Sequence, residues 1–466
     1  MSFVIRSLFV CLFASCRTVK SAKMTDRSER MLHSRRGTRQ SAQRTLVPVR
    51  TVLVVFLVVV IFLYGVAARV FYQQQTLSIR DDAKSFQQPQ QQQPQPQQQD
   101  TTPRMDMTYN EWRQKVVELA TMPASQTIRE LEEKDPFGTR RFEKLLLSEE
   151  SKRGATLSLK EIQKLFPCPK DRISLPDQRD HSRAASFRAG DEQTFLYFQH
   201  LRKAGGTNFC TLAEQNLPHK AVPSYYCMPD MNWSGKTCAG CLHHWTNQQI
   251  VDNLRTSGHR IAGNEWDEFD RANHFDLPAV YATSFRRPLD RALSQFRFEC
   301  IEDRGCKFKE VEPWWQKRRD LSNVYTRTFS DTNLRPLREL YQSTTAEDGE
   351  KRGKIIGDAL DVVAQFHLVL VMEWLAYAGT SVKDVLGFEH ISALTKRVRP
   401  HIGQFKRDDG QEVNKLGAAG IAKASWVPKD YLSADQYKIM SEDLALDEVL
   451  TDAGRRFFLE RLVCPN

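Results

Sequence analysis

The segment that decides the fold reads Thr194-Phe-Leu-Tyr-Phe-Gln-His-Leu-Arg-Lys-Ala-Gly-Gly-Thr-Asn208. Its opening residues, Thr194 to Phe198, are rich in aromatic side chains and predict a buried strand. A loop with two glycines follows, and we expect a helix from Thr207. The glycines let the backbone approach a ligand closely, and the helix N-terminus adds amides and a positive dipole. The segment therefore predicts a strand, an anion-binding turn and a helix in succession.

Two segments further along repeat the strand-then-helix pattern. Ala279-Val-Tyr-Ala-Thr-Ser-Phe285 predicts a second strand, and a helix should open at Pro288, where proline suits the first turn. His367-Leu-Val-Leu-Val-Met372 predicts a third strand, followed by a helix through about Leu386. Strands that alternate with helices predict an α/β fold around a mostly parallel sheet, which we expect to span residues 193–466.

The excess of positive charge lies at the N-terminus. The chain of 466 residues has a formal net charge of +10, but residues 1–50 hold 11 Lys/Arg against 2 Asp/Glu, which leaves 56 against 55 for the remainder. A remainder so close to neutral argues against nucleic acid as a partner. The hydrophobic content of 41% is ordinary for a globular protein.

An uncharged apolar stretch runs from Thr51 to Ala68 and, extended to residue 72, predicts one membrane span. At about 1.5 Å per residue it nearly covers a hydrocarbon core of about 30 Å. Five arginines lie between residues 35 and 50, so the positive-inside rule places residues 1–50 in the cytosol and the bulk of the chain in a lumen. We therefore expect a signal-anchor at residues 51–72 and a single-pass type II topology.

The segment between the anchor and the domain has two parts. Residues 73–107 contain a glutamine- and proline-rich tract without apolar side chains to bury, which predicts a disordered stem. Residues 108–192 mix charges with apolar residues at helical spacing, such as Trp112, Val116 and Leu119, and predict a helical lead-in.

Eight cysteines follow the apolar stretch, an even number that fits disulfides in an oxidising compartment. They are Cys168, Cys210, Cys227, Cys238, Cys241, Cys300, Cys306 and Cys464, and the sequence does not fix their pairing. Cys238 and Cys241 stand beside His243 and His244, residue types that also bind zinc, but adjacent histidines fit one tetrahedral ion poorly. We favour disulfides. Asn232-Trp-Ser234 is a glycosylation sequon that a lumenal chain can use.

The loop after the first strand places Lys203 before Gly205 and Gly206. An ammonium there can reach the bridging oxygen of a phosphosulfate and stabilise the charge that develops as the bond to sulfur breaks. In the G-x-x-x-x-G-K-[ST] loop of nucleotide triphosphatases the lysine follows the glycines. That difference, together with the lack of an evident Mg²⁺-binding carboxylate motif, argues against a kinase on the same fold.

The second strand leads into Ser284-Phe-Arg-Arg-Pro-Leu-Asp-Arg-Ala-Leu-Ser-Gln-Phe296. Arg286 ends the strand, where open α/β sheets bind ligands. Ser294 lies two helical turns further and can share a phosphate with it, as a hydroxyl beside a charged donor. Taken alone, this segment is also typical of a solvated basic helix start, which is common.

Together the two motifs resemble those of the PAPS-dependent Golgi carbohydrate sulfotransferases, especially the heparan sulfate O-sulfotransferases. His200-Leu-Arg-Lys-Ala-Gly-Gly-Thr207 is similar to the family's His-x-x-Lys-Thr-Gly-Gly-Thr, and Phe285 to Phe296 to its Leu-Arg-x-Pro-x-x-Arg-x-x-Ser-x-Tyr/Phe. Residues 369–374 and 446–462 also look similar to its late strand and closing helix, so the resemblance covers residues 194–462. It implies a P-loop-like sulfotransferase fold and PAPS (3′-phosphoadenosine 5′-phosphosulfate) as co-substrate.

The resemblance also implies the residues that contact PAPS. Those for the 5′-phosphosulfate are Lys203, Ala204, Gly205, Gly206, Thr207 and Asn208, and those for the 3′-phosphate are Arg286 and Ser294. Ala204 replaces the family's usual threonine, from which we expect a modest loss of contacts.

Transfer to an alcohol also needs a base for the hydroxyl proton, and histidine titrates near working pH. Cys241-Leu-His-His-Trp-Thr246 resembles the Leu-His-x-x-Trp-Thr region of heparan 6-O-type enzymes, whose histidine is the base, with two residues missing. His243 and His244 both remain candidates, with a slight preference for His243, and Glu265 is the reserve. His200 is expected to be structural.

The sequence thus predicts transfer of a sulfuryl group from PAPS to a hydroxyl of a glycan or proteoglycan, by a single-pass type II protein of the Golgi membrane. The alternative is a glycan-binding protein that keeps the fold without transfer, which Ala204 and the shortened histidine region make tenable.

Overall fold

The computed structural model describes residues 106–175, 181–224, 226–229, 242, 245–265, 267–302, 304–306, 308–330, 338–395, 428 and 432–464. The expected anchor at residues 51–72, nearly all of the stem and the sequon at Asn232 lie outside these residues. Among the helices that are described, none combines the length and apolar character that a membrane span requires.

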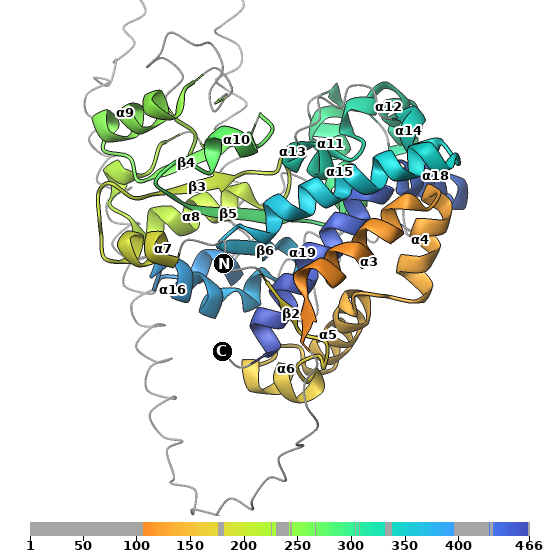
Figure 1. Cartoon of the computed structure of the whole chain (residues 1–466), viewed down its shortest axis with the longest axis horizontal. Helices are drawn as coiled ribbons and strands as arrows, with labels where there is room; N and C mark the ends of the chain where they lie inside the picture. Colours follow the sequence, from red (N-terminus) through yellow and green to blue (C-terminus); the bar gives the residue numbers. More distant parts are fainter. Residues whose placement is uncertain are drawn as a thin grey trace, which may run out of the picture. The chain divides into compact units, whose positions relative to one another are not determined.

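The described residues form an α/β unit around a parallel sheet of four strands in the order β4-β3-β5-β6 (Figure 1). The strands are β3 (Phe195–Gln199), β4 (Ile261–Asn264), β5 (Ala279–Phe285) and β6 (Leu368–Val371). Every strand residue is buried, as expected for a parallel sheet covered on both faces. The α/β prediction with a mostly parallel sheet is confirmed. The second strand has the predicted bounds, and the first begins one residue later than predicted.

The register of the sheet brings the ends of its four strands to one edge. Gln199, the last residue of β3, is paired with Asn264 at the end of β4 and with Thr283 near the end of β5. Phe285 is paired with Val371, the last residue of β6. The loops that follow these strands therefore begin side by side at the carboxyl edge, the ligand-binding edge of open α/β sheets.

Helices lie around the sheet in two groups. Those of the N-terminal segment are α3 (Tyr109–Thr121), α4 (Ala124–Glu133), α5 (Thr139–Arg153), α6 (Leu159–Leu165) and α7 (His181–Arg188). Those within and after the strands include α8 (Gly206–Asn216), α9 (Asn247–Ser257), α11 (Pro288–Phe296), α13 (Val324–Phe329), α15 (Ala346–Ala364), α16 (Gly379–Leu386), α17 (Ser392–Thr395), α18 (Ala434–Asp443) and α19 (Ala445–Val463). Helix α11 opens at Pro288 as predicted, and α8 opens one residue earlier than predicted.

The sheet separates two hydrophobic cores. Side chains of β3 alternate between them, as the two-residue period of a strand requires: Tyr197 packs in the first core and Phe198 in the second. The first core also contains Trp112 of α3, and the second contains Phe142 of α5. The segment expected as a helical lead-in is therefore helical and packs in the same cores as the strands.

Three disulfides join described cysteines. They are Cys168–Cys464, Cys210–Cys227 and Cys300–Cys306. The first ties the end of α19 to the chain after α6, and the second ties α8 to the segment before β4. Cys238 and Cys241, with the zinc alternative that they raised, lie outside the described residues.

Candidate functional site

The turn between β3 and α8 is shaped by close packing. Lys203 has a φ of +65° and Gly205 a φ of +99°, both in the left-handed region. At Gly206 a Cβ atom would lie 1.6 Å from Nε2 of His200, and at Gly205 one would lie 2.7 Å from Sδ of Met372. Neither position can accept a larger side chain without a shift of its neighbour. The glycines therefore allow the turn to lie directly on the imidazole and the thioether.

Two side chains from the end of β5 hold this turn. Ser284 Oγ donates to the carbonyl oxygen of Ala204 at 2.7 Å, and Arg286 Nη1 donates to that of Lys203 at 3.2 Å. The two sequence motifs, about eighty residues apart, thus meet at the carboxyl edge of the sheet. The amide of Ala204 donates to Leu201 within the loop, and the Ala204 side chain is buried in the first core. The side chain that differs from the family pattern therefore faces the protein interior.

The first turn of α8 is the candidate anion site. Amides at the start of a helix have no intrahelical acceptor and point along its axis toward a ligand. Gly206, Thr207 and Asn208 occupy this turn. The Asn208 side chain donates to the carbonyl oxygen of Ala393 at 2.9 Å and fixes α8 to α17, so it has a packing role as well.

The ammonium of Lys203 lies over the ring of Phe298, 3.4 Å from the ring centroid. Phe298 belongs to a short π-helical turn, Arg297–Glu302, that follows α11. An ammonium over an aromatic face is stabilised by the ring quadrupole, by roughly 0.5–2 kcal/mol according to exposure. The contact therefore fixes the direction of the Lys203 side chain from a third segment, which sequence reasoning missed because no motif marks this phenylalanine.

Arg286 is buried, and its backbone carbonyl accepts a hydrogen bond from the Tyr325 hydroxyl at 3.0 Å. Ser294 lies two turns into α11 and is half-buried. Both predicted 3′-phosphate residues are thus carried by one strand-to-helix segment at the same edge as Lys203.

The segment after β4 supplies a carboxylate. Glu265 Oε2 lies 3.9 Å from His200 Nδ1, and Glu265 Oε1 lies 3.9 Å from Arg202 Nε. The His200 ring stacks on Phe198, and its Nδ1 has no hydrogen-bond partner among the described residues. Burial, reinforced by Lys203 and Arg202, lowers the pKa of His200 from 6.5 to about 4. Its imidazole is therefore neutral at physiological pH, and its packing against Gly206 agrees with the expected structural role.

A buried polar network fixes the position from which Glu265 projects. The Gln199 amide donates to the carbonyl oxygens of Asn264 and Asp267, at 3.1 and 3.0 Å. The Asn264 amide donates to the Tyr197 hydroxyl at 2.9 Å, which in turn lies 3.2 Å from His274 Nδ1. In the sequence, the signal for this network is that Gln199 and Asn264 are polar residues at the ends of otherwise apolar strands.

His243 and His244 lie outside the described residues. Their flanking residues, Leu242 and Trp245, are buried in the first core together with Leu201 and Ala204 of the Lys203 loop. The amide of Trp245 donates to the carbonyl oxygen of Leu242 at 2.9 Å. The described neighbours of both histidines therefore belong to the core beneath the site.

A cluster of charged side chains packs against the turn that follows Arg286. The next residue, Arg287, forms an ion pair with Glu143 of α5, and its amide donates to Glu373 Oε1 at 2.9 Å. Glu143 also pairs with Arg455 of α19 at 3.0 Å. In the same region, burial raises the pKa of Asp290 to about 7. Sequence reasoning missed Glu143, since nothing local in the lead-in segment points to a partner in the residue before α11.

Comparison of the chain with protein-family models, with curated proteins and with solved structures found no match.

Proposed function

We propose that this protein transfers a sulfuryl group from PAPS to a hydroxyl of a glycan. The observation that carries the proposal is the contact between Arg286 and the carbonyl oxygen of Lys203, since it brings together the two motifs to which the proposal assigns phosphate binding. The helix N-terminus of α8, the lysine and the arginine are three sources of positive potential in the segments that follow β3 and β5. That combination fits a ligand with two anionic groups, as PAPS has.

Each residue has a defined role in this proposal. The first-turn amides of α8 and Lys203 bind the 5′-phosphosulfate, and Arg286 with Ser294 binds the 3′-phosphate. The acceptor oxygen forms a bond to sulfur while the bond from sulfur to the 5′-phosphate oxygen breaks, and the base takes the acceptor proton. Lys203 stabilises the negative charge that develops on the departing oxygen.

The base is one of three residues. Glu265 projects from the end of β4 beside His200 and Arg202, at the same edge as Lys203. His243 and His244 are the other candidates, through their resemblance to a family histidine. Glu265→Gln, His243→Ala and His244→Ala, each assayed across pH, identify it, because loss of the base removes the acidic limb of the pH–rate profile.

The acceptor and the location follow the same resemblance. We propose a glycan or proteoglycan acceptor, and a Golgi membrane protein anchored by residues 51–72 with its catalytic domain in the lumen. The three disulfides fit an oxidising compartment. Protection of the domain from added protease in intact microsomes, and its loss on detergent treatment, tests this topology independently of catalysis.

The deciding experiment measures transfer of radiolabelled sulfate from PAPS to a panel of desulfated glycans by the fragment from Thr101 to the C-terminus. Lys203→Ala should retain the fold and lose transfer. If the wild type transfers sulfate and Lys203→Ala does not, the proposal is supported, and the glycan that is sulfated reveals the acceptor class. PAPS binding without transfer to any acceptor supports the glycan-binding alternative, and absence of PAPS binding refutes the proposal.

A further inference from the structure

The turn that carries Phe298 is closed by a disulfide. Cys300 and Cys306 are bonded across a sequence separation of 6. The amide of Cys306 donates to the carbonyl oxygen of Cys300 at 2.9 Å, and the amide of Gly305 donates to that of Ile301 at 3.2 Å. A covalent bond and two hydrogen bonds therefore fix the shape of the segment directly after Phe298.

This segment is anchored in a third hydrophobic core. Cys300 is buried there together with Trp314 of α12 (Val311–Lys317), and Cys306 packs against the same core. Phe298 is only half-buried. The position of its ring therefore depends on the neighbouring residues that the core and the disulfide hold.

The ring of Phe298 links this disulfide to the candidate site. Lys203 Nζ lies 3.4 Å from the ring centroid. A lysine side chain has several rotatable bonds, so its ammonium keeps one direction only where contacts hold it. One such contact is the Phe298 ring. The Cys300–Cys306 pair therefore acts on Lys203 through one intervening side chain.

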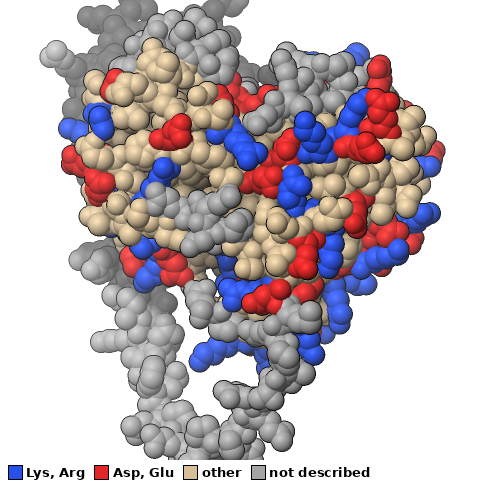
Figure 2. Space-filling view, viewed as in Figure 1, with Lys and Arg blue, Asp and Glu red and all other residues tan. Residues whose placement is uncertain are grey.

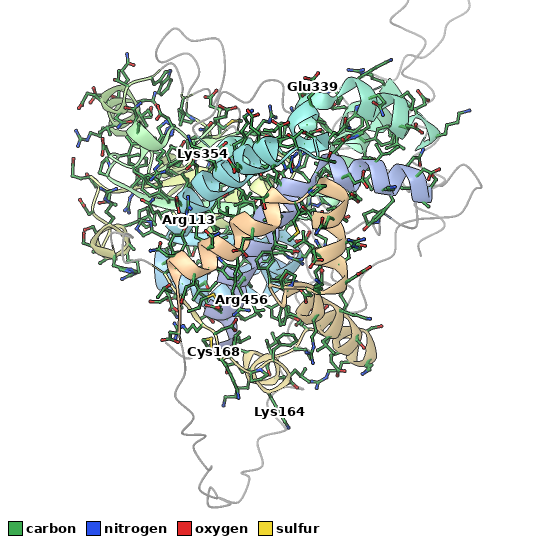
Figure 3. All side chains as sticks on the ribbon, turned by 45° about the vertical axis from the view of Figure 1, so that its right-hand side comes forward. Arg113, Lys164, Cys168, Glu339, Lys354 and Arg456 are labelled. Carbon is green, nitrogen blue, oxygen red and sulfur yellow. A yellow bond between two sulfur atoms is a disulfide. The ribbon has the colours of Figure 1, made fainter. Side chains whose placement is uncertain are left out.

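The disulfide between Cys168 and Cys464 closes a far longer stretch of chain. Its sequence separation is 296, against 6 for Cys300–Cys306. Opening a short loop returns less freedom to the unfolded chain, so the effect of opening Cys300–Cys306 should be mainly local. Figure 1 shows α11 and α12, on either side of the short loop, at the upper side of the molecule, and Figure 3 labels Cys168 at the lower side. The longer disulfide is therefore a suitable control.

We propose that the Cys300–Cys306 disulfide is a redox-sensitive positioning element for Lys203. The intact disulfide holds the Phe298 ring against the ammonium. Reduction by a dithiol lets the turn move, so the ammonium loses this contact and its direction. The consequence for catalysis, slower sulfuryl transfer, rests on the proposed function.

Reduction proceeds by thiol–disulfide exchange. A thiolate of the dithiol attacks Sγ of Cys306, which is half-buried, whereas Cys300 is buried. The bond between the two protein sulfurs breaks, and Cys300 leaves as a thiolate that takes up a proton. The second thiol of the reductant then attacks the mixed disulfide, and Cys306 leaves and is protonated in turn. The protein gains two electrons and two protons, and the dithiol becomes a disulfide.

The test measures the reactivity of Lys203 in the full chain, because this readout does not depend on catalysis. An acylating reagent reacts with a neutral amine, whereas contact with an aromatic face stabilises the ammonium. Lysine and arginine side chains are spread over the visible surface in Figure 2. Lys354, exposed on α15 and labelled in Figure 3, serves as the internal reference. Mass spectrometry gives the acylation rate of Lys203 relative to that of Lys354.

The double variant Cys300→Ala with Cys306→Ala should raise the acylation rate of Lys203. The rise should not exceed that of Phe298→Leu, which is roughly 2- to 30-fold. Adding Phe298→Leu to the double variant should give the rate of Phe298→Leu alone, because both changes remove the same contact.

Two comparisons control for the loss of a disulfide as such. Cys168→Ala with Cys464→Ala should leave the Lys203 rate unchanged. Dithiothreitol should raise the rate in the wild type and leave Phe298→Leu unchanged, which tests the link even if the double variant does not fold. Alkylation by iodoacetamide shows whether Cys306 has been reduced.

An unchanged Lys203 rate in the folded double variant would overturn the proposal, as would an equal rise in the control. A further rise on adding Phe298→Leu, or resistance of Cys306 to dithiothreitol, would also overturn it. In transfer assays the double variant should lower kcat more than it raises KM for PAPS, and an unchanged kcat would contradict the proposal. Absence of PAPS binding by the wild type would refute the proposed function, whereas the acylation of Lys203 decides the positioning role separately.

Discussion

The guanidinium of Arg286 donates to the carbonyl oxygen of Lys203, with 3.2 Å between Nη1 and the oxygen. This bond joins the loop after β3 to the loop after β5, so Arg286 shapes the turn. In the proposed function Arg286 also binds the 3′-phosphate. A guanidinium has five N–H donors in a planar fork and suits phosphate, whereas an ammonium binds as a point charge. Arginine at this position is therefore not equivalent to lysine.

Arg286→Lys should bind PAPS roughly 10- to 100-fold more weakly than the wild type, the usual cost of losing a charged hydrogen bond or two. The discriminating measurement compares PAPS with adenosine 5′-phosphosulfate, which lacks the 3′-phosphate, by isothermal titration calorimetry. The wild type should prefer PAPS strongly, and the variant should lose most of that preference. An unchanged preference would place the 3′-phosphate elsewhere.

Phe298→Leu should reduce kcat more than it weakens PAPS binding, because the ring directs the Lys203 ammonium and the proposed function assigns it no contact with PAPS. Loss of the cation–π contact is worth roughly 0.5–2 kcal/mol, which corresponds to about a 2- to 30-fold slower transfer. Phe298→Tyr keeps the aromatic face and should restore the rate. If leucine and tyrosine give the same rate, the ring has no positioning role.

The strands and helices around the site were the predictable part of the fold. Strand β5 and the start of α11 have the predicted bounds because seven consecutive buried residues and a proline at the first helical position leave little ambiguity. Strand β4 was not predicted, since Ile261 to Asn264 is short and contains glycine and asparagine. The sequence also named Glu265 as the reserve candidate for the base, but it did not show that Glu265 lies beside His200.

The residues that hold the site in place could not be predicted from local sequence patterns. Glu143 reaches Arg287 across more than a hundred residues, and only the tertiary packing of α5 makes them partners. Phe298 lies in a π-helical turn, whose spacing follows neither the 3.6-residue period of an α-helix nor the two-residue period of a strand. The residues that bind a ligand follow motifs, whereas those that hold them in place depend on contacts that a single sequence does not reveal.

Glu143→Ala should destabilise the protein strongly, because it leaves the guanidinium groups of Arg287 and Arg455 without their shared carboxylate. The Arg455 side chain is buried, whereas that of Arg287 is partly exposed. Removing one partner of a buried ion pair typically costs about 3–5 kcal/mol, so most of the loss should come from Arg455. The matched control is Glu149→Ala, on the same helix, whose carboxylate pairs with the exposed Lys152 and should contribute less than about 1 kcal/mol. Urea denaturation measures both. Similar losses in the two variants would mean that the buried cluster contributes no more than a surface pair.

Protonation of His274 should destabilise the fold at mildly acidic pH. Its Nδ1 accepts the amide of Asp270 at 3.1 Å, and burial lowers its pKa from 6.5 to about 4. Since the unfolded chain takes up this proton at higher pH than the folded chain does, stability present above pH 6.5 is lost as pH falls toward 4. Linkage gives a loss of roughly 2 kcal/mol between pH 7 and pH 5.

The comparison that isolates this effect uses His274→Gln, because glutamine cannot take up the proton. Its stability deficit relative to the wild type should shrink by roughly 2 kcal/mol between pH 7 and pH 5 in urea denaturation. Other buried groups titrate equally in both proteins and cancel in the difference. A constant deficit for His274→Gln would show that this imidazole accepts a proton as readily in the folded chain as in the unfolded one.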